Sequence, residues 1–147
     1  MKAFRIAVAV LVAALCATSI SCSDTERLDL PNATLEGTIT YKGQPVPYAL
    51  VVVVPKDGGE LSATGNADRE GHYKVEYVPL GEVQIGVNTE AGKGIAMEEA
   101  MAAAQGPGAP PMPKMVEIPQ KFFEPSTSGI TTTIQEGANT FDIVIPE

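Results

Sequence analysis

"LEGTITYKGQPVPYALVVVVP" (residues 35–55) determines the fold class predicted for this chain. Its first part alternates, with Leu35, Ile39 and Tyr41 on one side of an extended chain and mostly threonine on the other. Two prolines interrupt the alternation, and residues 48–55 then form an almost wholly apolar, β-branched run. We therefore expect a half-exposed first strand followed by a strand with both faces covered.

The same alternation recurs along the chain between clusters of turn-forming residues. Further strands are predicted in residues 61–67, 72–78, 83–88, 130–134 and 139–145. The expected fold is all-β, an antiparallel, Ig-like sandwich of about seven strands. The side chains predicted to share a face within a strand are Tyr73, Val75 and Tyr77; Val83, Ile85 and Val87; and Phe141, Ile143 and Ile145.

Residues 89–125 do not follow this rhythm. Residues 95–104 contain strong helix formers and no breaker, which predicts a short helix. The Gly- and Pro-rich stretch after them suits neither a helix nor a central strand. We interpret residues 89–125 as a long loop insertion in one domain spanning residues 33–147. Its composition favours a mobile insertion, and a binding loop is the alternative.

The N-terminal residues have the pattern of a bacterial export signal. Lys2 and Arg5 precede an uncharged apolar run over residues 6–20, which is shorter than the ~20 residues needed to span a bilayer. Residues 18–21 resemble a lipobox, in which the cysteine that follows is acylated and becomes the first residue of the mature protein. Cys22 is therefore the predicted lipid attachment site.

The other roles open to Cys22 fit the sequence less well. The only other cysteine, Cys16, lies within the apolar run and would leave with the signal, so no disulfide is expected. A zinc site would lack ligands, because His72 is the only histidine.

Acylation divides the N-terminal region into two segments. Residues 1–21 are the expected lipoprotein signal peptide and residues 22–32 a polar tether. Secretion with cleavage near Ser19 or Ser21 is one alternative, and an uncleaved anchor is another. The expected location is the cell envelope, on the outer or inner membrane, facing the periplasm or the exterior. By resemblance to enterobacterial lipoproteins, Ser23 favours the outer membrane.

Four motifs occur in an order typical of one family. They lie in residues 37–46, in "ADREGHY" (67–73), in "PLG" (79–81) and in "IPQKFFEPSTSGI" (118–130). Together they resemble the carboxypeptidase regulatory-like domains, which are transthyretin-like β-sandwiches, in the form carried by short bacterial lipoproteins. The resemblance implies a non-catalytic module. The matching residues of the first motif are Gly37, Gly43, Pro45 and Val46.

Catalytic and metal-binding patterns are incomplete. A Ser-His-acid triad would need His72, which falls in a predicted hairpin turn, and the chain has no G-x-S-x-G elbow. A Ca²⁺ site would require two acidic turns to share one end of the sandwich, without a D-x-D-x-D-G series. We expect no enzyme, no cofactor and no metal. The candidate Ca²⁺ ligands, were the turns to meet, are Asp57, Glu60, Asp68 and Glu70.

An isopeptide bond between Lys42 or Lys74 and Asn139 is also disfavoured. Such a bond needs a buried acid beside both partners, whereas lysines are usually solvated and asparagines usually lie in turns.

The expected function is that of a non-catalytic, lipid-anchored envelope protein that acts as a binding or assembly module. A net charge of -8 argues against a nucleic-acid partner. We expect a monomer whose partners are membrane lipid, through Cys22, and an envelope protein or glycan. The alternatives are a structural component without a ligand and a carbohydrate-binding module, which needs exposed aromatic side chains. The tyrosines expected instead in the core or in cross-strand pairs are Tyr41, Tyr48, Tyr73 and Tyr77.

Overall fold

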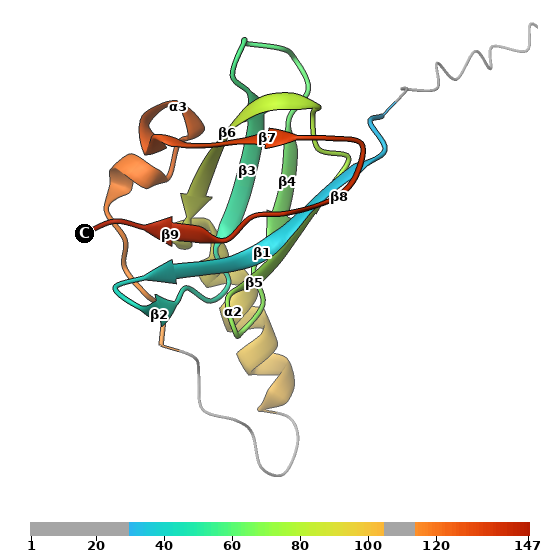
Figure 1. Cartoon of the computed structure of the whole chain (residues 1–147). Coiled ribbons are helices and arrows are strands. Elements are labelled where there is room, and N and C mark those ends of the chain that lie inside the picture. Colours follow the sequence, from blue (N-terminus) through green and yellow to red (C-terminus); the bar gives the residue numbers. More distant parts are fainter. Residues whose placement is uncertain (1–29, 105–113) are drawn as a thin grey trace, which may run out of the picture.

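Two β-sheets face each other in the computed structural model, which describes residues 30–104 and 114–147 (Figure 1). These residues form nine strands, one long helix and two short helical turns. The expected all-β sandwich is confirmed. Cys22, the signal peptide and residues 22–29 of the tether lie outside the described residues, and no described helix is both long and apolar enough to cross a membrane.

The first sheet is built around β1 (Ala33–Tyr41), which has partners on both sides. On one side it pairs antiparallel with β5 (His72–Glu76) and, through a tight hairpin, with β2 (Gln44–Pro45). On the other side it pairs in parallel with β8 (Gly137–Thr140) and β9 (Ile143–Ile145). β1 is therefore the central strand of this sheet.

The second sheet has four strands in the order β4-β3-β6-β7. β4 (Ala63–Asn66), β3 (Leu50–Pro55), β6 (Gly81–Asn88) and β7 (Ile130–Ile134) pair antiparallel throughout. The β4–β5 turn joins the two sheets along one side, with a bridge between Ala67 and Tyr73. On the opposite side of the sandwich, β7 of the second sheet lies next to the β8–β9 segment of the first sheet, as Figure 1 shows.

Two features of the first sheet correct the expected arrangement. The segment 139–145 is not one strand, because the chain leaves the ladder at Phe141 and Asp142 and so forms β8 and β9. Both pair with β1 in parallel, since the chain crosses from the second sheet to the first after β7. The fold therefore has nine strands rather than about seven, and its pairing is mixed.

The core follows the predicted alternation closely. Leu35, Ile39, Val51 and Val53 have no exposed surface, and the buried cluster continues through β5, β6 and β9. Tyr77 departs from the prediction, since its side chain is 54% exposed. β5 ends at Glu76, and the positive φ of Tyr77 (57°) reverses the chain so that Val78 enters the core instead. The inward side chains on the later strands are Tyr73, Val75, Val83, Ile85, Val87, Ile143 and Ile145.

The apolar run of β3 is fully covered on its inner face only. Val52 is half-buried, and its partner across the ladder is Gly86 of β6. A Cβ atom at Gly86 would lie 2.7 Å from the carbonyl oxygen of Phe123, so the chain after η1 (Gln120–Phe122) crosses the outer face there. α3 (Pro125–Ser128) continues from this crossing into β7. The described residues therefore cover the outer face of the second sheet only near Gly86, where the segment after η1 crosses it.

The helix in the long loop is longer than expected. α2 spans Thr89–Ala103, whereas the composition predicted residues 95–104. It begins early because the side-chain oxygen of Asn88 accepts a hydrogen bond from the backbone N–H of Ala91 at 3.0 Å, which caps the first turn. The start was missed because Gly92 and Gly94 lower the helix propensity of this turn.

Candidate functional site

An open hollow of about 500 Å³ lies over the outer face of the first sheet. β1 and β5 form its floor, and the end of β4 and the β8–β9 segment form its sides. We call this hollow the β1–β5 groove. Its lining residues are Glu36, Gly37, Thr38, Asn66, Asp68, His72, Tyr73, Lys74, Thr140 and Asp142.

Strand register brings the polar side chains of the groove together. In the β1–β5 ladder Glu36 lies opposite Lys74, and Thr38 lies opposite His72. Directly opposed residues on one face of an antiparallel pair have Cβ atoms about 5 Å apart. Because their neighbours point into the core, these four side chains form an outward polar row.

Asp142 fixes the side of the groove at the break between β8 and β9. One carboxylate oxygen, Oδ1, accepts hydrogen bonds from the backbone N–H of Thr38 (2.9 Å) and from its hydroxyl (2.7 Å). The carboxylate thus replaces the backbone partner that β1 lacks at this point. These hydrogen bonds, hydroxyl first, hold the pKa of Asp142 below its ordinary value, and the nearby His72 adds a smaller effect in the same direction.

The floor of the groove depends on a close backbone approach at Gly37. A Cβ atom there would lie 2.2 Å from the carbonyl oxygen of Phe141, so only glycine allows the β8–β9 segment to cross at this distance. The hydroxyl of Tyr73 donates to the same carbonyl oxygen at 2.6 Å. Burial, followed by the charge of Asp142, raises the pKa of Tyr73 far above its ordinary value, so this hydroxyl remains a donor.

The polar groups around the groove are mostly exposed. The His72 side chain is exposed and makes no hydrogen bond with any residue that the structure describes. The Thr38 hydroxyl donates to the Asp142 carboxylate, which also accepts from the Thr38 backbone N–H. Asp68 and Asp142 are exposed as well. The hollow is therefore an open groove with a largely polar lining.

Asp142 gives a prediction about pH dependence. Because its pKa is lower in the folded than in the unfolded protein, it stabilises the fold above the unfolded pKa of about 3.9, and this contribution disappears as the pH falls through the folded pKa. We expect Asp142→Asn to be less stable than the native chain at pH 7, with a difference that shrinks below about pH 4. Urea unfolding of both proteins from pH 7 to pH 2.5 measures this. A difference that stays constant over that range would contradict the assigned role.

The two acidic turns considered for Ca²⁺ do not meet. Asp57 and Glu60 precede β4, whereas Asp68 and Glu70 follow it, so the turns lie at opposite ends of that strand. Asp68 is committed to its own turn, where Oδ1 accepts from the backbone N–H groups of Glu70 and His72, both at 2.9 Å. In residues 30–104 and 114–147, no three His, Cys, Asp or Glu side chains come together as a metal site.

The groups considered for an isopeptide bond have other partners. The side-chain N–H₂ of Asn139 donates to three backbone carbonyl oxygens, those of Thr34, Gln135 and Gly137. Lys74 is exposed and forms an ion pair with Glu76 at 3.1 Å. Asn139 therefore stabilises the β7–β8 turn against β1.

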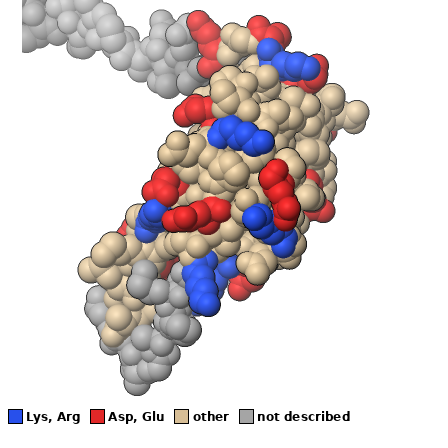
Figure 2. All heavy atoms as spheres, turned by 90° about the vertical axis from the view of Figure 1, so that its left-hand side faces the viewer, with Lys and Arg blue, Asp and Glu red and all other residues tan. Residues whose placement is uncertain are grey.

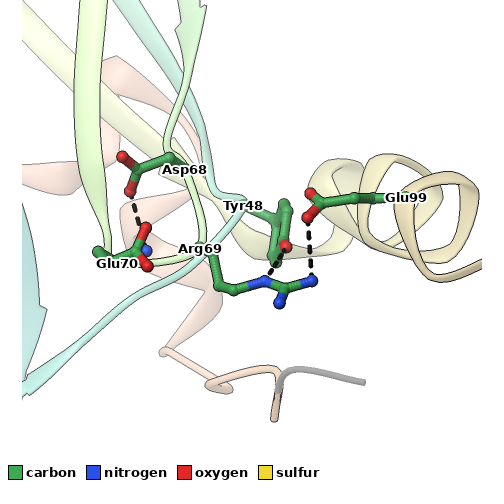
Figure 3. A network of polar contacts seen from close by, with 5 residues as sticks. All are labelled: Tyr48, Asp68, Arg69, Glu70 and Glu99. Carbon is green, nitrogen blue, oxygen red and sulfur yellow. Dashed lines mark hydrogen bonds and ion pairs between the residues drawn. The ribbon is translucent and has the colours of Figure 1, made fainter. Parts of the chain in front are cut away.

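Helix α2 is tied to the sandwich by a polar network that sequence analysis did not identify (Figure 3). Arg69 donates from Nε to the hydroxyl of Tyr48 (3.1 Å) and forms an ion pair with Glu99 of α2 at 2.9 Å. The backbone reinforces this contact, since a Cβ atom at Gly92 would lie 1.7 Å from the carbonyl oxygen of Tyr48. The described first half of the loop insertion is therefore docked on the β4–β5 turn.

The fold is an all-β sandwich, and the groove is an open, polar hollow on its first sheet. No family model matches the chain, and no curated protein matches it. Figure 2 shows Lys and Arg interspersed with Asp and Glu on the face it presents, without a broad basic patch there. Among the described residues, this face therefore lacks the clustered cations that phosphate binding needs.

Proposed function

We propose that the protein is a non-catalytic, lipid-anchored component of the bacterial cell envelope that binds a polar partner through the β1–β5 groove. The observation that carries this proposal is an open hollow of about 500 Å³ lined by outward polar side chains. His72, Lys74 and Glu36 are exposed and are not needed to cover the core. A surface with exposed donors and acceptors, positioned on a rigid sheet, can orient a polar ligand.

The turn geometry supports the resemblance to carboxypeptidase regulatory-like domains. Gly71 has a φ of 80°, and a Cβ atom there would approach the Ile39 carbonyl oxygen to 3.1 Å. Asp68 accepts hydrogen bonds within the same turn. A motif with Asp and Gly at these positions therefore has a mechanical reason in this chain. Membership of that family remains part of the proposal.

The anchor predicts an acyl group on Cys22. When the chain is expressed in a bacterial host fed an alkyne fatty acid, we expect the native protein to become labelled and Cys22→Ala to remain unlabelled. Cys16→Ala is the matched control and should label like the native chain, because Cys16 lies inside the signal. Equal labelling of native protein and Cys22→Ala, or no labelling of either, would contradict the anchor. The proposed location of the anchored protein is the periplasmic or outer face of the envelope.

The binding role predicts a partner whose capture depends on the groove. We expect pull-down from solubilised envelopes to recover one partner at near-stoichiometric yield, and a His72→Ala/Lys74→Ala double variant to lose it. Thr64→Ala, an exposed change on β4, is the control that should keep the partner. Retention by the double variant would place binding elsewhere. Absence of any stoichiometric partner would favour the structural alternative.

A carbohydrate-binding role has less support from the groove. The aromatic residue in its lining, Tyr73, is only 3% exposed and cannot offer a ring face for stacking. Tyr77 is exposed but does not line the groove. Saturable quenching of tyrosine fluorescence by soluble glycans would favour this alternative.

A further inference from the structure

Strand β7 offers an open edge. Its only partner in the described sheets is β6. The Ser128 hydroxyl donates to the carbonyl oxygen of Ile85 on β6 (2.6 Å) and accepts from the N–H of Ile130 (3.1 Å), so the backbone groups of Ile130 face β6. By the alternation of an antiparallel strand, the N–H and C=O groups of Thr131 and Thr133 point away from β6. These groups can accept another strand.

The sequence of β7 is symmetric. Its five residues, ITTTI, read the same in both directions. When two copies pair antiparallel about Thr132, Thr131 faces Thr133 of the second copy, and Ile130 faces Ile134. Each threonine then meets a threonine and each isoleucine an isoleucine, and the two-fold axis makes every such contact occur twice except the central one.

Two other edge strands, β9 and β4, carry features that discourage pairing, whereas β7 does not. β9 has three residues and is followed by Pro146, and Asp142 interrupts the ladder before it. β4 lies against β5, where a Cβ atom at Gly65 would be 2.1 Å from the Lys74 carbonyl oxygen. β7 contains no charge, proline or glycine, although such residues are the usual means of blocking an edge.

Space and charge around β7 also permit a second strand. A hollow of about 390 Å³ lies beside its first residues and separates Ile130 and Thr131 from Phe141 and Val144. On β6, the neighbour of Thr131 is Gln84, and the neighbour of Thr133 is Glu82. Glu82 forms an ion pair with Lys56, so two copies would not oppose unpaired like charges at this edge.

We propose that two copies of this chain pair through β7, antiparallel and across a two-fold axis at Thr132, and join their four-stranded sheets into one. The backbone groups of Thr131 and Thr133 would then exchange hydrogen bonds with Thr133 and Thr131 of the second copy. A single strand pair buries much less than the ~1,200 Å² of a stable interface, so association is weak and depends on local concentration. The proposal goes beyond the groove and does not depend on the lipid anchor.

Disulfide trapping tests this geometry. In the full chain with Cys16→Ser and Cys22→Ser, Thr132→Cys should form a covalent dimer under mild copper–phenanthroline oxidation. Residues opposed in a non-hydrogen-bonded pair have Cα atoms about 4.5 Å apart, within the range of a disulfide. Thr131→Cys is the matched control. In this register Thr131 faces Thr133 of the second copy, so the Cα atoms of the two introduced cysteines are offset by two residues along the strands and lie beyond the ~7 Å limit for a disulfide. This variant should cross-link at least tenfold more slowly. Thr131→Cys/Thr133→Cys should form dimers again.

A second pair of variants tests the backbone hydrogen bonds. Added to Thr132→Cys, Thr133→Pro removes an outward N–H without removing a β6 ladder bond, and it should abolish trapping. Thr133→Ala keeps that N–H and should trap at the Thr132→Cys rate. Circular dichroism of each variant verifies folding. The proposal is overturned if Thr132→Cys gives no dimer above the cysteine-free background, if Thr131→Cys traps equally fast, or if folded Thr133→Pro still traps.

Discussion

Gly37→Ala is expected to lower the free energy of unfolding by about 3 kcal/mol, at the upper end of overpacking changes. The added methyl group would lie 2.2 Å from the carbonyl oxygen of Phe141 and 2.8 Å from its carbonyl carbon, both backbone atoms. To relieve the overlap, the β8–β9 segment must move away from β1. That movement would lengthen the hydrogen bond from Tyr73 to Phe141 and those from Thr38 to Asp142.

Urea unfolding at pH 7 measures this effect. Glu36→Ala is the matched control, because it places the same side chain on the same strand, facing solvent, and should change stability by less than about 0.5 kcal/mol. Equal losses for the two variants would show that β1 tolerates a side chain at Gly37. They would contradict the requirement for glycine at the close approach to Phe141.

Gly92→Ala and Gly94→Ala should have opposite effects, although they lie in the same turn of α2. A methyl group on Gly92 would lie 1.7 Å from the Tyr48 carbonyl oxygen, so the helix must move off the sandwich and lose the ion pair between Arg69 and Glu99. We expect a net loss of about 2 kcal/mol, because overpacking outweighs the gain in helix propensity. At Gly94 nothing lies within 4 Å of the added group. That variant should gain up to about 1 kcal/mol.

Hydrogen exchange separates local from global effects in these variants. In Gly92→Ala, the amides of α2 should lose protection while those of β3 and β6 keep theirs, since the helix is docked on the sandwich and not part of its core. In Gly94→Ala, protection of α2 should rise. Similar protection of α2 in both variants would contradict docking through Gly92.

Local sequence predicted the strands well because burial follows a period of two. The inward sets on β1, β5 and β6 were predicted, since each of these strands has one face in the core. Prediction was wrong where a single backbone angle changes the direction of the chain. At Tyr77 a positive φ ends the alternation, and no local feature of the sequence indicates it. The start of α2 had a signal, the capping side chain of Asn88.

The candidate site could not be predicted because it depends on strand register. Glu36 and Lys74 are far apart in sequence and become neighbours only when β1 pairs with β5. His72 was weighed only as the histidine of a disfavoured catalytic triad, whereas the structure places it in an open polar row beside Asp142. The break between β8 and β9 also requires β1 as a parallel partner, and parallel pairing leaves no hairpin signal in the sequence.

The arrangement of β1 has a consequence for biosynthesis. Its partners on one side are made soon after it, but those on the other side end at Ile145. Closing such distant pairs is slow, because the ordering cost is met before the contacts form. A nascent chain that emerges residue by residue therefore keeps one flank of β1 without a partner strand until residues 137–145 have been made.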